Sequence, residues 1–200
     1  YRNATNSYDG IVVEARFADW QVHGVYVLPV SRFPTDSESL DGNERAFDKS
    51  FSERKFFGVY AASKDNNVKL QSYWLKEDDS EALATKNRDL YTLSVDYTQP
   101  FDNGLITNIE VVGQTGTSFQ TASANDTDEK DVRAYMLFGY VGKQVTDNTF
   151  LRAEVDYISG DNDTSDDTIS DFDTLYGVRR FDFGPTDVYQ AMPRRNLKAV

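Results

Sequence analysis

The side chains of this sequence that could do chemistry are arginines and carboxylates placed at every second position of short segments. A guanidinium group can bind a carboxylate through two parallel hydrogen bonds, so such arginines suit an acidic ligand. Carboxylates next to them keep that binding weak, as passage through a channel requires. Cross-strand ion pairs among the same residues are compatible with this role. The candidate pore-lining or substrate residues are Arg16, Arg133, Arg152, Glu14, Glu110, Glu154 and Asp156.

Catalytic chemistry has little support in the sequence. His23 is the single histidine, cysteine is absent, and no serine has the G-x-S-x-G setting of a nucleophile. Glu154 and Asp156 are spaced about 6–7 Å apart on one strand face, which fits a glycosidase pair, but carboxylate pairs on strand faces are common. We therefore expect a protein that is not an enzyme and that has no cofactor.

Four aspartates in one acidic run are the only candidates for a metal. They lack the glycine and the spacing of an EF-hand loop, so they predict weak divalent-cation binding at most and no dedicated metal site. These residues are Asp161, Asp163, Asp166 and Asp167.

Alternating apolar and polar residues, rather than helical periodicity, run through the chain. In the segment 9–17, Ile11, Val13 and Phe17 alternate with polar residues, and about seven further segments of roughly 9–11 residues behave similarly. In the segment 133–140 we assign the even positions to the apolar face, so Arg133 is expected on the inner, polar face. Strands of this length exceed those of typical soluble sheets and suit a tilted crossing of a bilayer.

Connections between the expected strands alternate between short and long. Tight turns rich in Asn, Asp, Gly and Pro occur near residues 18–19, 64–67, 100–104 and 144–148. The long polar loops are expected at 31–54, 76–89, 117–131 and 159–173, and they hold most of the acidic residues. Short turns at one end and long loops at the other are typical of an outer-membrane barrel. We thus expect one antiparallel transmembrane β-barrel domain over residues 1–200.

Composition limits the classes of partner that the protein can bind. The net charge is −12, from 33 acidic and 21 basic residues, which argues against nucleic acid. Aromatic residues such as Trp20, Trp74 and Tyr91 fall near strand ends, as in the aromatic girdles of membrane barrels.

Two alternatives to a transmembrane channel remain. One is a soluble β-sandwich or ligand-binding barrel, which requires the apolar face to pack on a second sheet, and the other is a plugged structural or adhesive outer-membrane barrel.

Short motifs in the chain resemble the alginate-export family of Gram-negative outer-membrane porins. The opening has Arg2-Asn3 followed by Tyr8-Asp9-Gly10 and a hairpin that ends in an aromatic-x-x-Pro-Val segment. The second half has the E-x-D-Y-x-S-G-D pattern and then F-D-x-L-Y. The motif residues are Arg2, Asn3, Asp9, Gly10, Ser159, Gly160, Asp161, Phe172 and Asp173.

This resemblance implies a monomeric, 18-stranded barrel of which the chain forms about half. It also implies export or diffusion of an alginate-like polyuronate or of smaller anionic solutes. The expected partners are outer-membrane lipid and lipopolysaccharide, the anionic solute, and periplasmic export proteins. The inner face here mixes Arg with Glu and Asp, which departs from the family's positive pore and leaves the solute open.

Overall fold

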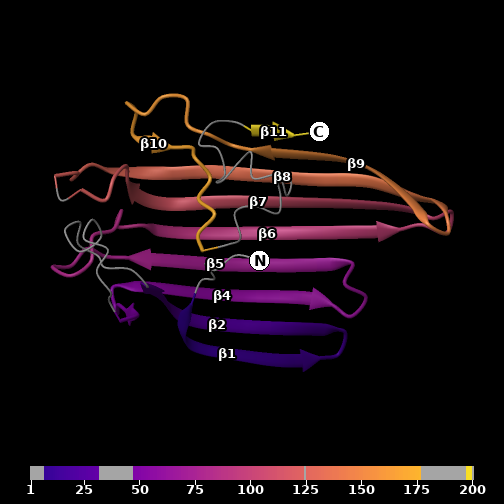
Figure 1. Ribbon diagram of the computed structural model, residues 1–200, viewed down its shortest axis with the longest axis horizontal. Coiled ribbons are helices and arrows are strands. Elements are labelled where there is room, and N and C mark those ends of the chain that lie inside the picture. The colour runs from indigo at the N-terminus through magenta and orange to yellow at the C-terminus, as the bar shows by residue number, and fades with distance from the viewer. Residues whose placement is uncertain (1–6, 32–46, 124, 177–196, 200) are drawn as a thin grey trace.

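An antiparallel sheet of eight long strands and three short ones makes up the computed structural model, which describes residues 7–31, 47–123, 125–176 and 197–199 (Figure 1). The long strands are β1 (Tyr8–Phe17), β2 (Trp20–Ser31), β4 (Arg54–Ser63), β5 (Val68–Glu77), β6 (Asp89–Pro100), β7 (Leu105–Phe119), β8 (Glu129–Thr146) and β9 (Thr149–Ile158). The short strands are β3 (Lys49–Ser50), β10 (Thr168–Ile169) and β11 (Leu197–Ala199). No described helix is long and apolar enough to span a membrane.

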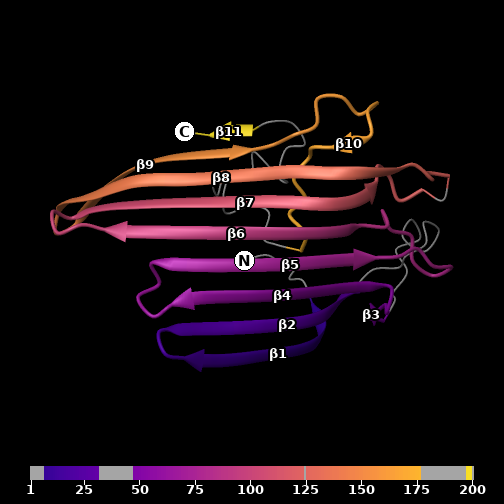
Figure 2. The same cartoon turned by 180° about the vertical axis from the view of Figure 1, so that it is seen from behind.

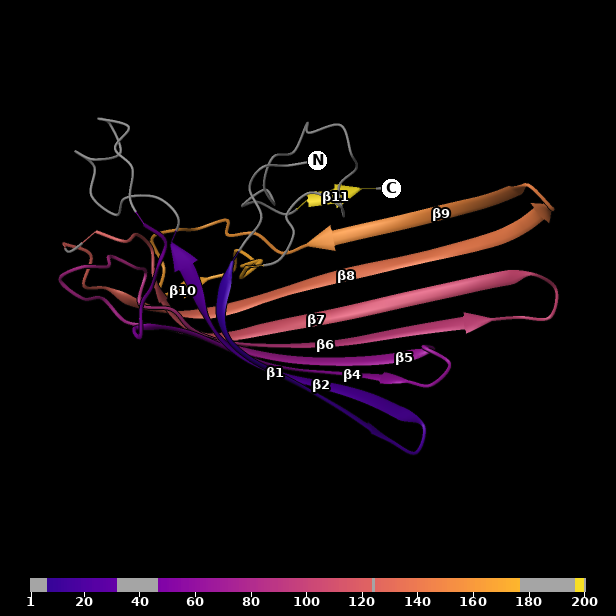
Figure 3. The same ribbon diagram turned by 60° about the horizontal axis from the view of Figure 1, so that its bottom comes forward.

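Consecutive long strands pair with one another from β1 to β9, so the sheet is an antiparallel meander. The all-β, antiparallel fold expected from the sequence is confirmed. Figure 3 shows that the strands form a curved surface rather than a flat one. Within the described residues β1 pairs only with β2, so the other edge of β1 has no described partner.

Turn chemistry sets the two ends of the sheet apart. At one end the strands are joined by tight turns, in which Ala18, Asn66 and Gly104 adopt positive φ angles of 49°, 57° and 78°. Asp65 stabilises one of these turns by accepting hydrogen bonds from the Ser63 hydroxyl and the Asn67 backbone N–H. The longer connections lie at the opposite end, on the left in Figure 1. Among the described residues, the short connections thus lie at one end of the sheet and the longer ones at the other. We call these the turn end and the loop end.

The outer face of the sheet carries a band of apolar side chains that nothing in the described part of the chain covers. Leu70, Val95, Val111 and Leu137 lie next to one another across four strands and are 41–51% exposed. A continuous apolar patch of this kind marks contact with a membrane or a partner. The soluble β-sandwich alternative needed a second sheet on this face, and no described strand supplies one.

The face assignment for residues 133–140 is wrong. Arg133 pairs with Thr115 and Leu137 pairs with Val111, which places the odd positions of β8 on the outer face. Met136 and Phe138 therefore point inward. The misassignment has a physical cause: both faces of β8 carry apolar residues, and a choice of the other parity moves every side chain to the opposite face. Arg133 does not line the inner face.

One segment crosses the inner face of the sheet. Residues 168–176, which we call the inner strap, start with β10 paired in parallel to β8 and then run across β7 and β6 toward β5. In Figure 1 this orange segment passes in front of the sheet, and in Figure 2 it passes behind. Leu175 of the strap is buried with Leu75, Leu90 and Val132 of the sheet.

The inner strap includes the second half of the expected loop 159–173. Its acidic composition indicates an outer loop, yet the second half of the segment folds onto the inner face. Apolar residues explain the difference, because Ile169, Leu175 and Tyr176 pack against the apolar cluster of the sheet. Most of the expected loop 31–54 lies outside the described residues.

Candidate pore wall

At the turn end of the inner face, side chains of β1 and β2 form a polar cluster. Arg16 Nη2 lies 2.7 Å from Glu14 Oε1, and Gln21 Nε2 donates to the same oxygen at 3.1 Å. His23 completes the cluster with a 2.9 Å hydrogen bond between its Nε2 and the Gln21 amide nitrogen. The Arg16 side chain is 76% exposed, so its guanidinium is accessible from the space in front of this face.

A second arginine lies on the inner face of β9. Arg152 forms an ion pair with Glu154, and its guanidinium carbon lies 5.0 Å from the centre of the Tyr140 ring on β8. The side chain of Arg152 is 48% exposed. Arg16 and Arg152 each pair with the carboxylate two positions away on their own strand, rather than with one across the sheet.

Carboxylates dominate the inner face between these two arginines. Glu110 accepts a 2.6 Å hydrogen bond from the Ser94 hydroxyl, and Asp96 lies 3.4 Å from the Lys69 ammonium. Asp156 is buried on β9. Asp96 and Glu110 are direct cross-strand neighbours. The structure therefore places Glu14, Glu110, Glu154 and Asp156 on the inner face, although spread over several strands rather than gathered at one point.

At the loop end, a buried ionic cluster attaches the inner strap to the sheet. Arg88 donates to both oxygens of Glu77, from Nε at 2.7 Å and from Nη2 at 2.8 Å, and its Nη1 donates to Asp173 Oδ2 at 2.7 Å. Arg54 Nε lies 3.6 Å from Glu77, and the Tyr176 hydroxyl donates to Glu77 at 2.7 Å. Glu77 is only 3% exposed. A buried carboxylate is costly unless hydrogen-bond donors and positive charges of this kind surround it.

The electrostatics of this cluster keep its hydrogen-bond roles fixed. Burial alone would lower the pKa of Arg88, but its hydrogen bonds with Glu77 and the charges of Asp173 and Glu77 raise that pKa above its usual value. Burial raises the pKa of the Tyr176 hydroxyl, and the Glu77 charge raises it further. Arg88 therefore stays cationic and Tyr176 stays protonated, so that both remain donors to Glu77.

Amide and lysine contacts add to this attachment. The Gln114 side chain makes two hydrogen bonds with the backbone of Asp173, one to its carbonyl oxygen at 3.0 Å and one from its N–H at 2.9 Å. Lys130, which is buried on β8, donates to the carbonyl oxygens of Thr164 and Asp166. The segment 159–176 is thus held at several points along the inner face.

Most of the described motif residues lie in the segment 159–176 and make contacts that hold its backbone. Ser159 donates from its hydroxyl to the Ser170 carbonyl oxygen at 2.8 Å, and Gly160 and Asp161 are buried next to it. Phe172 is half-buried, and Asp173 binds Arg88. The other motif residues have different settings. Gly10 lies so close to β2 that a Cβ would be 2.1 Å from the Tyr26 carbonyl oxygen, Asp9 is exposed on the outer face, and Arg2 and Asn3 lie outside the described residues.

The four aspartates of the acidic run do not gather around one point. Within the described residues no group of three or more histidine or acidic side chains could hold a metal ion. Asp163 instead accepts hydrogen bonds from the Ser165 backbone and hydroxyl, which lower its pKa. Asp161 accepts from the Asp163 backbone N–H. These carboxylates shape the backbone of the loop.

The sequence reasoning missed Arg54, Glu77 and Arg88, because it placed them in the long loops. Residue parity could have found them. Glu77 continues the inward positions Gln71, Tyr73 and Leu75, and Arg88 continues the inward series of β6. Their side chains reach the inner face at the point where the strands end.

The outer face has the dimensions of a membrane-spanning surface. On β8 the outward positions Tyr135 to Val141 are bounded by Arg133 and Lys143, which are separated by about 34 Å along the strand. At a strand tilt near 40° this distance corresponds to roughly 25 Å, the height of the apolar band of a membrane barrel. At the loop end, the rings of Tyr26, Phe57, Trp74 and Tyr91 form a continuous row.

A curved antiparallel sheet with an apolar outer band, an aromatic row and a polar inner face defines the wall of a transmembrane β-barrel of the outer-membrane type. A comparison with family models matches residues 1–200 to the family described as alginate export. The chain belongs to the alginate-export family, as its motifs suggested. This is a family of outer-membrane transport channels and not of enzymes. Searches of curated proteins and of solved structures find no match.

Proposed function

We propose that the chain forms part of a passive outer-membrane channel for an acidic polysaccharide, such as an alginate-like polyuronate, or for smaller anionic solutes. Membership of the family supports alginate export in general. The proposal of an acidic solute rests on the exposure and the ion pairing of the inward arginines. Arg16 and Arg152 are exposed on the inner face, and each is paired with a single carboxylate of its own strand.

An exposed, singly paired arginine suits transport. Its remaining N–H groups can donate to a passing carboxylate, while its resident partner competes for the same charge. Binding is then weak enough for the solute to leave. Arg88 differs, because Glu77 and Asp173 already occupy it and hold it mostly buried. Arg133 is not part of this solute path, since it lies on the outer face.

The inner strap supports a limit on solute size. It covers the inner surface of β5 to β8 at the loop end, where Leu175 is buried. A segment held across the inner face narrows the path and favours an extended polymer or a small solute over a folded protein. The same observation also favours a second candidate function, namely a barrel that the strap plugs, with a structural or adhesive role. Conductance separates the two functions.

We expect Arg16→Ala combined with Arg152→Ala to reduce anion preference and to leave assembly intact. Each arginine contributes about 1 kcal/mol to a unit negative charge near 4 Å in water, so the anion-to-cation permeability ratio should fall by up to about fivefold for each site in low salt. Reversal potentials of the full-length protein in a salt gradient measure this ratio.

Arg133→Ala is the matched control, because it removes an exposed arginine with one acidic neighbour from the outer face. This variant should leave the permeability ratio unchanged. A change with Arg133→Ala and none with the Arg16/Arg152 pair would show that the assignment of the two faces is inverted.

A further inference from the structure

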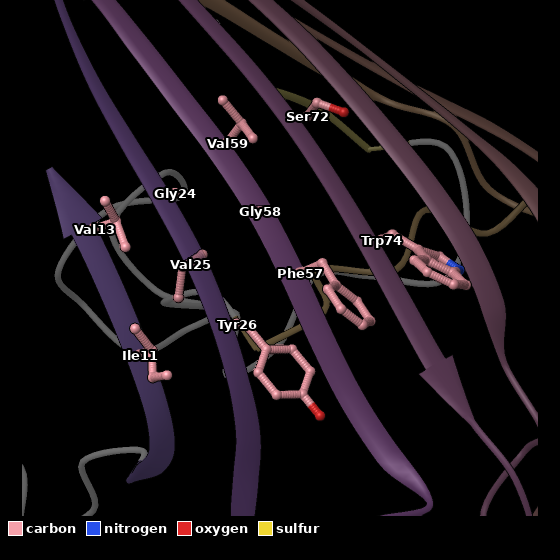
Figure 4. Close-up of a pocket in the computed structure, with 10 residues that line it drawn as sticks. All are labelled: Ile11, Val13, Gly24, Val25, Tyr26, Phe57, Gly58, Val59, Ser72 and Trp74. Atoms are coloured by element: carbon pink, nitrogen blue, oxygen red, sulfur yellow. The ribbon is translucent and has the colours of Figure 1, made fainter. Parts of the chain in front are cut away.

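The outer face is hollowed at two places, both centred on glycine. The first hollow, which we call the Gly24 groove, has a volume of about 460 Å³ and crosses β1, β2, β4 and β5 (Figure 4). Its apolar lining includes Ile11, Val13, Phe57, Val59 and Trp74. A Cβ built on Gly24 would meet nothing within 4 Å. The groove exists because this outward position of β2 carries no side chain.

The second hollow repeats the arrangement on β6 to β8. It has a volume of about 580 Å³ and is lined by Leu93, Gly113 and Tyr135 among others. A Cβ on Gly113 would also meet nothing within 4 Å. Strand pairing places Gly24 and Gly113 on one cross-strand row, through Val59, Ser72 and Leu93. Both hollows therefore lie on the same cross-strand row of the outer face.

An aromatic row borders the Gly24 groove on the side of the loops. The ring centres of Tyr26 and Phe57 are 4.8 Å apart, those of Phe57 and Trp74 are 4.8 Å apart, and those of Trp74 and Tyr91 are 5.6 Å apart. In Figure 4, Tyr26, Phe57 and Trp74 lie side by side along one border of the groove. Aromatic residues of this kind lie at the level of the lipid headgroups.

Two lysines lie one row beyond the aromatic residues. Lys55 and Lys76 are direct cross-strand neighbours, and like charges in that position repel each other. Asp89 and Asp78 lie 3.2 and 3.5 Å from the Lys76 ammonium. Among the described residues Lys55 has no acidic partner. Lys76 is therefore already neutralised, and Lys55 is the lysine of this row that is open to an external anion.

We propose that the Gly24 groove and Lys55 together bind one molecule of lipopolysaccharide through its lipid part. One acyl chain occupies the groove, and a phosphate of the headgroup contacts Lys55. Barrels of the outer membrane have their long loops on the cell exterior. The loop end of this sheet therefore lies in the outer leaflet, and the phosphorylated lipid of that leaflet is lipopolysaccharide. The proposal does not depend on which solute the channel passes.

Native mass spectrometry of the full-length protein in neutral detergent tests this proposal. The probes are bisphosphorylated lipid A and its dephosphorylated form. Wild type should retain bisphosphorylated lipid A. Gly24→Leu fills the groove and should weaken this binding about tenfold or more, because each buried methylene contributes roughly a fourfold factor. The open space around Gly24 allows this variant to fold.

Matched controls separate the groove from general lipid contact. Ala61→Leu adds bulk to the outer face outside the groove and should leave binding unchanged. Lys55→Gln should reduce the preference for the phosphorylated form about fivefold, whereas Lys143→Gln at the turn end should not. If wild type and all variants retained both lipids equally, the lipid would be bound non-specifically around the barrel, and the proposal would be overturned.

Discussion

Alanine at Arg88 is expected to destabilise the barrel and to free the inner strap. Arg88 makes a bidentate contact with Glu77 and a third bond to Asp173. Its loss leaves Glu77, which is 3% exposed, with Arg54 and Tyr176 as its remaining described partners. Removal of one member of a buried ion pair costs about 3–5 kcal/mol, and the two remaining partners place the expected loss near 3 kcal/mol. Urea unfolding of the full-length protein in lipid measures this loss.

The Asp173→Ala variant separates release of the inner strap from loss of folding stability. It removes the bond to Arg88 and the acceptor for the Leu175 N–H, but it leaves Glu77 fully paired. The single-channel conductance of this variant should rise while its unfolding midpoint changes less than that of Arg88→Ala. Arg152→Ala is the control for the unfolding midpoint alone, because it breaks a partly exposed arginine–carboxylate pair and should cost about 1 kcal/mol or less. Unchanged conductance in both strap variants would show that the strap does not narrow the path.

Arginine at position 70 is expected to impair insertion into a bilayer. Leu70 lies in the middle row of the outer face, beside Ala61 and Val95, and is 41% exposed. A charge placed there faces the hydrocarbon, which costs about 2–4 kcal/mol near the midplane. The folded fraction on unboiled electrophoresis gels and the unfolding free energy in lipid both report this cost.

Gln71→Arg is the matched control on the same strand. Gln71 faces inward beside Tyr60 and Ser94, so its replacement places the same charge toward water. We expect a cost well below that of Leu70→Arg. A larger loss for Gln71→Arg than for Leu70→Arg would contradict the assignment of the outer face to lipid.

The strands and their connections follow from local sequence. Alternation in segments such as 9–17, with tight turns at 18–19 and 64–67, predicts a sheet with short turns at one end, and the structure has that sheet. Alternation is sufficient because the outer face contains little but apolar residues along most strands. It fails on β8, where Met136 and Phe138 face inward and Leu137 faces outward. When both faces are apolar, only pairing with β7 decides which face is which.

The inner strap depends on contacts between residues far apart in the chain. Composition alone predicts that the acidic segment 159–173 is a solvated loop. The interactions that turn it inward join Asp173 to Arg88 and Gln114, and Leu175 to the apolar cluster on β5, β6 and β8. No spacing rule encodes these contacts. The same limit explains why Glu77 and Arg88 were assigned to loops rather than to the inner face.

Conductance of the full-length protein in a planar bilayer tests the central claim most directly. Uronate oligomers and neutral oligosaccharides of equal length are added in turn to an open channel. The proposed function predicts stepwise conductance that uronates block and neutral sugars do not, with weaker block in the Arg16→Ala/Arg152→Ala variant. Equal block by both sugars would contradict selection for acidic solutes, and a folded protein without conductance would contradict the channel itself.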